Sequence, residues 1–405
     1  KIVYYESSRG CPFACSYCLS SLDRVRFRST DLVCRELQFF LDRRIPQVKF
    51  VDRTFNCRHS HAQTIWKYIR DHDNGITNFH FEIAADLLNE DELELLSGMR
   101  PGLVQLEIGV QSANPDTIRE IDRVMDLDHL QKIVERIRKG RNIHQHLDLI
   151  AGLPMENYES FKNSFDRVYA MKPDQLQLGF LKVLKGSKMS RRSGDYDMVF
   201  SEAAPYEVYS TRWLTYEQLL ELKAVEEMVE VYYNSAQFSG TIEELSGEET
   251  LGTAFNMFYM MAEHYRTHQL NGKKHSRLER FDFLRDFIRE NLPEEKNGFY
   301  EEILIRDLYL RENSKKRPAW AKEHPEYKKI FRDFYIKESQ NPEYLSGYEN
   351  YDSRQIARMT HSEVFTYDIS GGGEKGVHLV VFDYKNRDPL SGNAKMIEIP
   401  EGFLS

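Results

Sequence analysis

Three cysteines stand on one short loop near the start of the sequence. Cys11, Cys15 and Cys18 have the spacing C-x3-C-x2-C, and Gly10 and Pro12 mark the segment as a loop. Three thiolates at this spacing can hold three irons of a [4Fe-4S] cube, whereas a self-sufficient cube normally takes four cysteines. One iron would then remain open to another ligand.

A structural zinc loop is the alternative interpretation of these cysteines. Tetrahedral zinc needs a fourth protein ligand, and no cysteine or histidine follows Cys18 within the usual few residues. The spacing therefore favours an iron-sulfur cluster over zinc.

Strand-like and helical runs alternate up to about residue 185, which is typical of βα units and a parallel sheet. A helix is expected to begin after the cysteine loop at Ser29 or Thr30, either of which can cap it. The fold class we expect is α/β, with a partial (βα)6 TIM-like barrel. The six expected strands span residues 2–6, 48–52, 79–84, 104–110, 143–150 and 175–183.

Polar and apolar residues alternate along several of these strands. Because successive side chains of a strand point to opposite faces, one face of the sheet would pack against helices and the other would line a polar lumen. A water-exposed sheet face is the alternative, but such faces favour Lys, Thr and Ser. The residues expected to point into the lumen are His80, Glu82, His144, His146, Gln175 and Gln177.

His144, His146 and Asp148 share one face of their strand, so a metal site there is an alternative. Two histidines and one carboxylate are a known ligand set for iron. Residues two apart on a strand are separated by roughly 6.5 Å, however, which suits a row of hydrogen-bonding groups better than chelation. We therefore favour contacts with a polar substrate.

The rest of the chain changes character. A stretch over residues 185–194 contains Gly, Ser and Arg and predicts a linker or lid. Helical patterns dominate from there to about residue 337, and a β-hairpin with a long loop is expected over residues 364–383. We expect a partial barrel with the cysteine loop over residues 1–190, a helical C-terminal region over 205–340, and an extension with the hairpin over 341–405.

Composition limits the partners. The 405 residues carry a net charge of -9 and 41% hydrophobic residues, so a nucleic-acid partner is not expected. No stretch approaches the roughly 20 apolar residues of a membrane span, and a signal peptide is not apparent, so we expect a cytoplasmic protein that does not bind membranes. The chain starts at Lys1, only ten residues before the cysteine loop, which suggests that it is clipped upstream.

Six segments together resemble one branch of the radical S-adenosylmethionine (SAM) superfamily over roughly residues 1–240. They are the cysteine loop and the runs VDRTFN, FEIAADLL, EIGVQS, HLDLIAGLP and LQLGFLKVLKG. Members of that branch usually carry an N-terminal cobalamin-binding domain and a C-terminal domain of unknown function. This chain has the C-terminal region and lacks the cobalamin domain, so cobalamin would be available only through a domain missing from it.

The resemblance implies which residues contact SAM. Tyr17 would lie beside the adenine, and Asp52 would receive the SAM amine in place of the Gly-Gly-Glu run of other members. Glu107 and Gln111 match the segment that contacts the ribose and carboxylate. The fifth-strand segment that flanks the adenine is matched by Asp148, Ile150 and Gly152.

The function that the resemblance implies is that of a radical SAM enzyme. A reduced [4Fe-4S] cluster would cleave SAM to methionine and a 5'-deoxyadenosyl radical, which abstracts hydrogen from a polar substrate in the lumen. If cobalamin takes part, methyl transfer to an unactivated carbon is expected. The electron donor would be a flavodoxin or a ferredoxin.

Two alternatives remain open. One is a methylthiotransferase that modifies a nucleic-acid base, which the acidic charge and the lack of further cluster cysteines disfavour, since only Cys34 and Cys57 lie outside the loop. The other is a non-catalytic regulator that binds a cluster and SAM. Production of 5'-deoxyadenosine would distinguish an enzyme from such a regulator.

The cluster assignment makes a direct prediction. Protein reconstituted anaerobically should bind about four irons per chain and show visible absorption that bleaches in air. Cys15→Ala should abolish both, because it removes one of the three thiolates. A full cube in this variant, measured by iron content and absorption, would show that the loop is not the cluster site.

Overall fold

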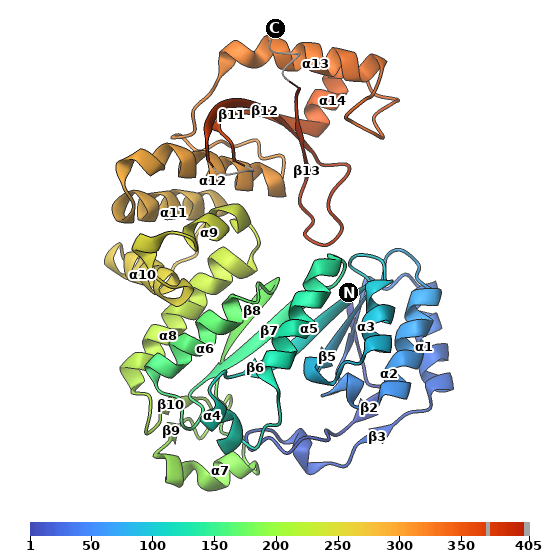
Figure 1. Ribbon diagram of the computed structural model, residues 1–405, viewed down its shortest axis with the longest axis vertical. Coiled ribbons are helices and arrows are strands. Elements are labelled where there is room, and N and C mark those ends of the chain that lie inside the picture. The colour runs from blue at the N-terminus through green and yellow to red at the C-terminus, as the bar shows by residue number, and fades with distance from the viewer. Residues whose placement is uncertain (370–372, 401–405) are drawn as a thin grey trace. The chain divides into compact units, whose positions relative to one another are not determined.

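The computed structural model describes residues 1–369 and 373–400. Its chain divides into two compact units, Lys1–Glu230 and Val231–Ser405, which are described separately (Figure 1).

The first unit is built on one six-stranded sheet. All neighbouring strands run parallel, in the order β1-β4-β5-β6-β7-β8, and β1 and β8 form open edges. The sequence-based prediction of a six-stranded α/β partial barrel is thereby confirmed. The strands are β1 (Ile2–Tyr5), β4 (Gln47–Phe50), β5 (Asn78–Ile83), β6 (Val104–Gln111), β7 (His144–Ala151) and β8 (Gln175–Phe180).

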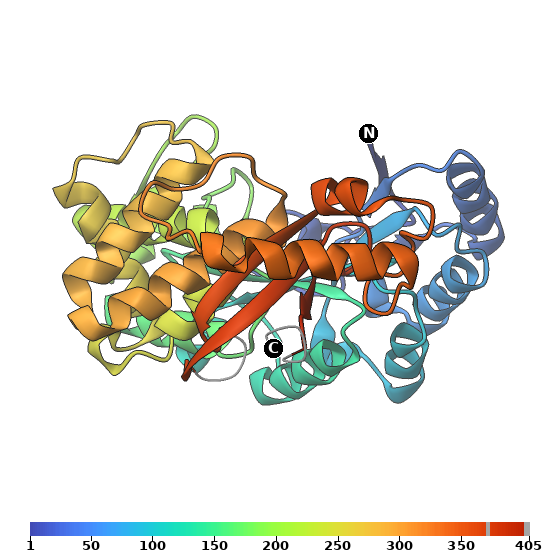
Figure 2. The same ribbon diagram turned by 90° about the horizontal axis from the view of Figure 1, so that it is seen from above.

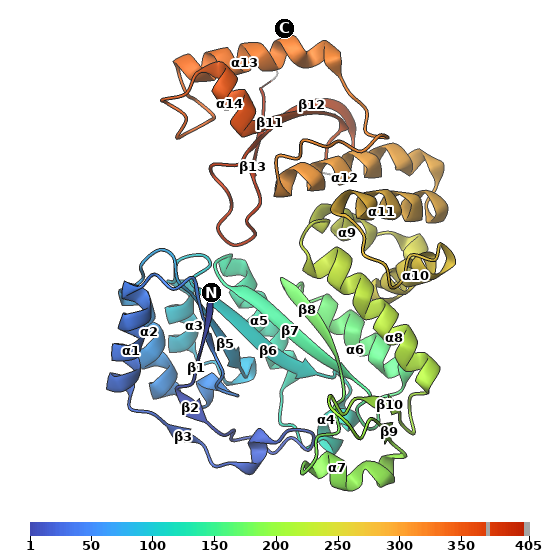
Figure 3. The same ribbon diagram turned by 180° about the vertical axis from the view of Figure 1, so that it is seen from behind.

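Five helices cover one face of this sheet (Figures 1 and 3). Four of them begin at a capping side chain, and α2 does not; the Ser29 side chain, for example, accepts a hydrogen bond from the backbone N–H of Leu32. Apolar strand residues such as Phe81 pack beneath them, with Phe55 and Trp66 as aromatic neighbours. The helices are α1 (Thr30–Asp42), α2 (His59–Asp71), α3 (Glu90–Ser97), α5 (Leu127–Gly140) and α6 (Tyr158–Tyr169).

Short elements complete the first unit. The antiparallel strands β2 and β3 bracket the cysteine loop, and β10 pairs with β9 beyond the sheet. These elements are β2 (Ser8–Arg9), β3 (Arg26–Phe27), α4 (Pro115–Glu120), α7 (Lys188–Arg192), β9 (Val199–Phe200), β10 (Val208–Ser210) and α8 (Tyr216–Met228).

The stretch over residues 185–194 is not the linker that its composition predicted. It contains α7, whose Met189 side chain is fully buried and whose Met189 N–H donates to the carbonyl of Ser16 at 2.7 Å. Tyr196, also buried, donates to Glu120 at 2.6 Å. Burial and hydrogen bonding of these two residues hold α7 and the residues that follow it in place, although the Gly and Ser content of the stretch is typical of a flexible linker.

A π-helical segment, Val229–Asn234, continues α8 across the boundary between the two units, which lies between Glu230 and Val231. A set of helices follows: α9 (Ser239–Leu245), α10 (Ala254–Thr267), α11 (Arg277–Asn291) and α12 (Asn297–Arg311). Asp307 of α12 is fully buried and accepts hydrogen bonds at the start of α9 from the N–H groups of Gly240 and Thr241 and from the Thr241 hydroxyl. This one carboxylate therefore ties α9 to α12.

A three-stranded antiparallel sheet ends the chain, with β12 (Lys375–Asp383) between β11 (Thr360–Tyr367) and β13 (Lys395–Glu398). The hairpin expected over residues 364–383 is present, although part of its loop, residues 370–372, lies outside the described residues. The third strand was not predicted, because its four residues are too short for a recognisable alternation.

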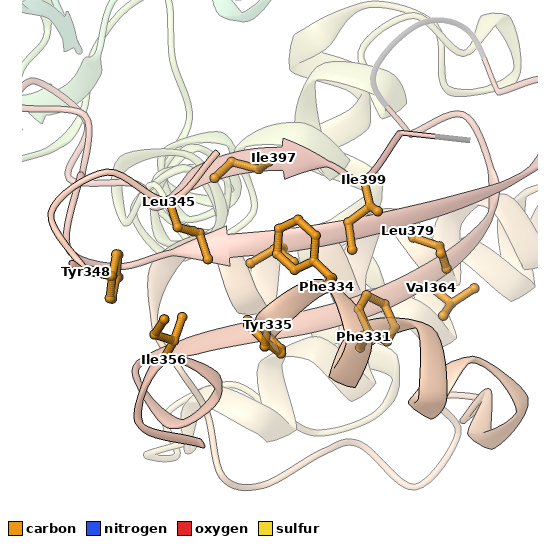
Figure 4. Close-up of a cluster of buried hydrophobic side chains, with 11 residues drawn as sticks. Phe331, Phe334, Tyr335, Leu345, Tyr348, Ile356, Val364, Leu379, Ile397 and Ile399 are labelled. Carbon is orange, nitrogen blue, oxygen red and sulfur yellow. The ribbon is translucent and has the colours of Figure 1, made fainter. Parts of the chain in front are cut away.

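Two helices, α13 (Lys328–Gln340) and α14 (Ser353–Met359), cover one face of this small sheet. Figure 2 shows α13 crossing over β11 and β12, and Figure 4 shows the buried cluster between them. Phe334 and Tyr335 of α13 and Ile356 of α14 pack there against Val364 and Val381 of the strands. The sheet is therefore held by an apolar core of its own.

Across residues 1–369 and 373–400, no helix combines the length and apolar character needed to cross a membrane.

Asp307→Ala should destabilise the second unit. The change leaves two backbone N–H groups and a hydroxyl without their buried acceptor, which should cost about 3 kcal/mol. Denaturant unfolding would measure it, with Asp333→Ala as the control, because Asp333 is half exposed and its ion pair with Arg332, 3.6 Å away, lies at the surface. Equal stability of the two variants would contradict the role given to Asp307.

Candidate functional site

A cavity of about 260 Å³ opens at the carboxyl ends of β5, β6 and β7. Cys11, Cys15, Cys18 and Tyr17 of the cysteine loop form part of its wall. The strands contribute Glu82 of β5, Glu107 of β6 and Asp148 of β7 to the lining. The structure thus brings the loop and the polar strand ends to one place.

The cysteine loop is held in a single path. Gly10 has φ of +89°, and a Cβ there would lie 2.8 Å from the carbonyl oxygens of Asp23 and Arg24, so only glycine allows the loop to close. The backbone N–H of Ser16 donates to the carbonyl of Ile121 at 2.9 Å. The loop therefore reaches the cavity from a fixed base.

The donor set at the cavity fits a three-thiolate cluster. Cys15 is buried, Cys11 and Cys18 are partly exposed, and all three are free of disulfides. No fourth cysteine appears among the described residues that line the cavity. Cys57 lies outside the lining, and burial raises the pKa of its thiol to about 11, so it stays protonated. Three thiolates and one open position are what a [4Fe-4S] cluster with an exchangeable ligand needs.

Arg123 is a site residue that the sequence analysis missed. Its guanidinium donates to the carbonyl of Gly109 and lies 3.9 Å from the Cys15 sulfur. Burial raises the pKa of the Cys15 thiol, and Arg123 opposes that rise by favouring the thiolate. Arg123 stands in a loop after α4, where neither periodicity nor a quoted motif distinguishes it from a surface arginine.

Glu107 is the fixed negative charge of the cavity. The Nζ of Lys49 and the Nε2 of His80 lie 3.1 Å and 2.8 Å from the same Oε atom of Glu107. Burial works against the carboxylate, but hydrogen bonds from His80 and Lys49 outweigh it and lower the pKa of Glu107 to about 2. Lys49 was overlooked although its position between Val48 and Phe50 puts it on the polar face.

Glu82 is paired in register with Glu107 on the neighbouring strand, but its pKa is shifted in the opposite direction. Burial and then the charge of Glu107 raise the pKa of Glu82 to about 7. Its nearest cation, an Nη atom of Arg53, is 3.7 Å away. Glu82 can therefore hold or release a proton near neutral pH.

His146 and Asp148 form the third polar contact of the lumen, with Nε2 3.0 Å from Oδ1. Burial opposes the imidazolium, yet Asp148 raises the pKa of His146, while burial raises that of Asp148. Ligand atoms of Glu107, His146 and Asp148 lie within 4.8 Å of one another. The side chains of His146 and Asp148 therefore approach each other more closely than their separation along the strand suggests, whereas His144, the third residue of the expected set, is not part of this group.

Asp52 does not take the position that the resemblance implied. Its carboxylate is fully buried and accepts hydrogen bonds from the Ser7 N–H at 3.0 Å, the Ser7 hydroxyl at 2.7 Å and the Ser8 hydroxyl at 2.6 Å. Asp52 is also absent from the described lining of the cavity. It anchors the chain just before the cysteine loop, because Ser7 and Ser8 supply three donors where a SAM amine was expected.

The remaining residues expected to contact SAM divide into two groups. Gln111, Asp148 and Ile150 line the cavity. Gly152 does not, and its φ is +91°. A Cβ at Gly152 would lie 2.6 Å from a methyl carbon of Val208, so this glycine allows β10 to pack closely on the end of β7.

The six residues expected in the lumen also divide into those at or near the cavity and those away from it. Glu82 lines the cavity, while His80 and His146 lie on the same face and contact the carboxylates of Glu107 and Asp148. His144, Gln175 and Gln177 are not among the lining residues. Register explains this for two of them: His144 and Gln175 are the first residues of β7 and β8, so they lie at the amino ends of these strands, away from the carboxyl ends that line the cavity.

Comparison with known proteins agrees with this geometry. A model of the radical SAM superfamily matches residues 5–168. A model of a protein family of unknown function, DUF4080, matches residues 194–382. Residues 5–168 are therefore a radical SAM domain, whose cofactors are a [4Fe-4S] cluster and SAM. The chain is a member of the radical SAM superfamily in which a DUF4080 domain follows the barrel.

Curated relatives match only in part. Oxygen-independent coproporphyrinogen III oxidase of Salmonella typhimurium is 32% identical over 107 residues, 25% of this chain and 23% of that protein. A tRNA-2-methylthio-N(6)-dimethylallyladenosine synthase of Rickettsia bellii is 28% identical over 184 residues, 42% and 41% of the two chains. The cobalamin-dependent radical SAM methyltransferase TokK of Streptomyces tokunonensis is 24% identical over 173 residues, which are 39% of this chain and 24% of that protein. The chain spans less than half the length of each.

Among solved structures, the radical SAM methyltransferase TsrM from Kitasatospora setae is similar with a TM-score of 0.43 and 17% identity, over 51% of this chain and 42% of that one.

Glu156 should make the stability of the first unit depend on pH. It is fully buried, and burial raises its pKa from 4.5 to about 7 although the hydroxyls of Ser112 and Ser164 donate to it. Between these two values the folded chain binds more protons than the unfolded chain, so stability falls as pH rises. Glu156→Gln should therefore stabilise the protein at pH 8, by at most about 3 kcal/mol, and far less at pH 4.

Thermal melts of wild type and variant at both pH values would measure this difference. Glu159→Gln is the control, because Glu159 is exposed on the next turn. A gain for Glu156→Gln that is the same at pH 4 and pH 8 would contradict the assignment.

Proposed function

We propose that this protein is a radical SAM enzyme that acts on a polar substrate held in the barrel lumen. The observation that carries the proposal is the convergence of Cys11, Cys15 and Cys18 with Glu107 on one cavity. The cluster and SAM would supply a 5'-deoxyadenosyl radical by reductive cleavage of SAM. The residues of this chain would bind the cluster and SAM, orient the substrate and keep water out of the cavity.

The cysteine loop would bind the cluster through its three thiolates. Arg123 places a positive charge 3.9 Å from the Cys15 sulfur, which favours the thiolate and partly offsets the negative charge of the loop. Asp52 contributes indirectly, because its hydrogen bonds to Ser7 and Ser8 fix the chain that leads into the loop.

SAM would lie along the cavity wall formed by Tyr17, Glu107, Gln111, Asp148 and Ile150. Glu107 is suited to accept hydrogen bonds from hydroxyl or ammonium groups, because its pKa near 2 keeps it charged at any working pH. Gln111 and its neighbour Gly109 lie next to Arg123, so the end of β6 joins the cluster side of the cavity to the SAM side.

Glu82, His80 and His146 are the groups best placed to orient the substrate. They stand on the same sheet face as Glu107, and a proton on Glu82 can be exchanged near neutral pH. In this proposal they hold a polar substrate by hydrogen bonds, while hydrogen abstraction depends on the cofactors. Water is limited by the apolar ring of Phe13 and by Ile83 in the cavity wall.

Within this class we favour cobalamin-dependent methyl transfer to an unactivated carbon. The resemblance to the cobalamin branch and the relationship to TokK support it. Methylthiolation of a nucleic-acid base is the second candidate, supported by the relationship to the Rickettsia bellii synthase. The net charge of -9 on this chain speaks for the first. A cytoplasmic flavodoxin or ferredoxin would supply the electron.

Anaerobic incubation of reconstituted protein with SAM and dithionite should yield 5'-deoxyadenosine. Glu107→Gln should keep the iron content and the visible spectrum but weaken SAM binding roughly ten- to hundredfold, since it loses a charged hydrogen bond worth about 1.5 to 3 kcal/mol. Equilibrium binding of SAM would measure this, with the exposed Glu90→Gln as the matched control.

Two results would count against the proposal. No 5'-deoxyadenosine from protein with a full cluster would favour the non-catalytic regulator. Unchanged SAM affinity in Glu107→Gln would place SAM elsewhere in the cavity.

A further inference from the structure

Two histidines and a glutamate meet on the surface of the second unit. His264 and His268 lie four residues apart on α10, so they share one helix face, and Glu290 lies in the last turn of α11. The Nδ1 of His264 is 2.9 Å from one Oε atom of Glu290, and the Nε2 of His268 is 3.1 Å from the other. We call these three residues the α10–α11 triad.

One residue of the triad, His264, is buried, and the other two are exposed to solvent. The His264 side chain is only 4% exposed, whereas those of His268 and Glu290 are 44% and 49% exposed. The two imidazole rings stand 4.3 Å apart, and the edge of His264 contacts Phe287. The arrangement leaves one side of the triad free for water.

Both recorded partners of the Glu290 carboxylate are imidazoles. The nearby arginines of α11 point to another acid: Arg285 and Arg289 donate to Glu301 at 2.7 Å and 3.3 Å. Two imidazoles around one carboxylate are more than a single ion pair requires.

The spacing of the ligand atoms suits a small cation. One atom from each residue lies within 4.8 Å of the other two. Zinc bonds of 2.0 to 2.2 Å in a tetrahedron put ligand atoms about 3.3 Å apart. One oxygen of Glu290, Oε2, lies 2.9 Å from the Nδ1 of His264 and 3.4 Å from the Nε2 of His268, so these two separations need to change by only a few tenths of an ångström.

We propose that the α10–α11 triad binds a divalent transition-metal ion, zinc by preference, with water in the remaining position. Two imidazoles and a carboxylate are a ligand set for zinc, whereas magnesium and calcium take oxygen ligands. The ion links α10 to α11 and so stabilises the DUF4080 domain. The site is separate from the barrel cavity and does not depend on the proposed function.

The test uses the full chain with its cluster reconstituted, so that the loop cysteines are occupied by iron. After equilibration with zinc and gel filtration, wild type should retain about one zinc per chain by elemental analysis. His268→Gln should lower the zinc affinity at least tenfold, and His264→Gln/His268→Gln should retain none. His268 is half exposed, so the single variant should fold normally.

A matched control is His378→Gln. His378 and Glu398 form another histidine–glutamate pair, 2.7 Å apart, without a second histidine. This variant should bind zinc as wild type does. A zinc concentration about a hundred times the dissociation constant should raise the melting temperature of wild type by roughly 5 to 10 °C, and that of the double variant by none.

The outcomes separate clearly. Zinc bound to wild type and to His378→Gln but lost from the double variant supports the site. Equal zinc in wild type and the double variant, or no retained zinc in wild type, overturns the proposal and leaves the triad as an ion pair. Magnesium should not shift the melting temperature, and a shift as large as that with zinc would also contradict it.

Discussion

The Asp52 carboxylate is the interaction on which the site depends most. It is fully buried and accepts three hydrogen bonds from Ser7 and Ser8, the residues that leave β1 and enter the cysteine loop. Without this acceptor the N–H of Ser7 and the hydroxyl of Ser8 would lose their buried partner, while the Ser7 hydroxyl would keep its contact with the Nε2 of His61 at 3.0 Å. The strand, the loop and the thiolates of the cavity are therefore positioned from one side chain at the end of β4.

The fold and much of the cavity could be predicted because their patterns are local. A period of two along β5, β6 and β7 places Glu82, Glu107 and Asp148 on one face whatever the details of packing. The cysteine spacing is equally local. These two patterns were enough to bring the loop and the strand carboxylates to one end of the sheet.

The misplaced residues are those whose roles depend on distant partners. Asp52 has the right type and parity for a ligand contact, yet two serines more than forty residues away use its oxygens. Arg123 reaches Cys15 across the chain, and α7 is fixed by the carbonyl of Ser16. Gln145, on the helix face of β7, donates from its side-chain amide to the carbonyl of Val134 at 3.1 Å. Periodicity carries no information about such pairs.

The contact between Gly152 and Val208 bears on how this protein could be recombined. Val208 lies in the DUF4080 match, which begins at residue 194, yet its side chain fills the space left by a glycine of the barrel. β9, β10 and α8 likewise belong to the first compact unit, which ends at Glu230. A chimera joined at residue 194 would mismatch these surfaces, whereas one joined in the π-helical turn Val229–Asn234 would keep each interior intact.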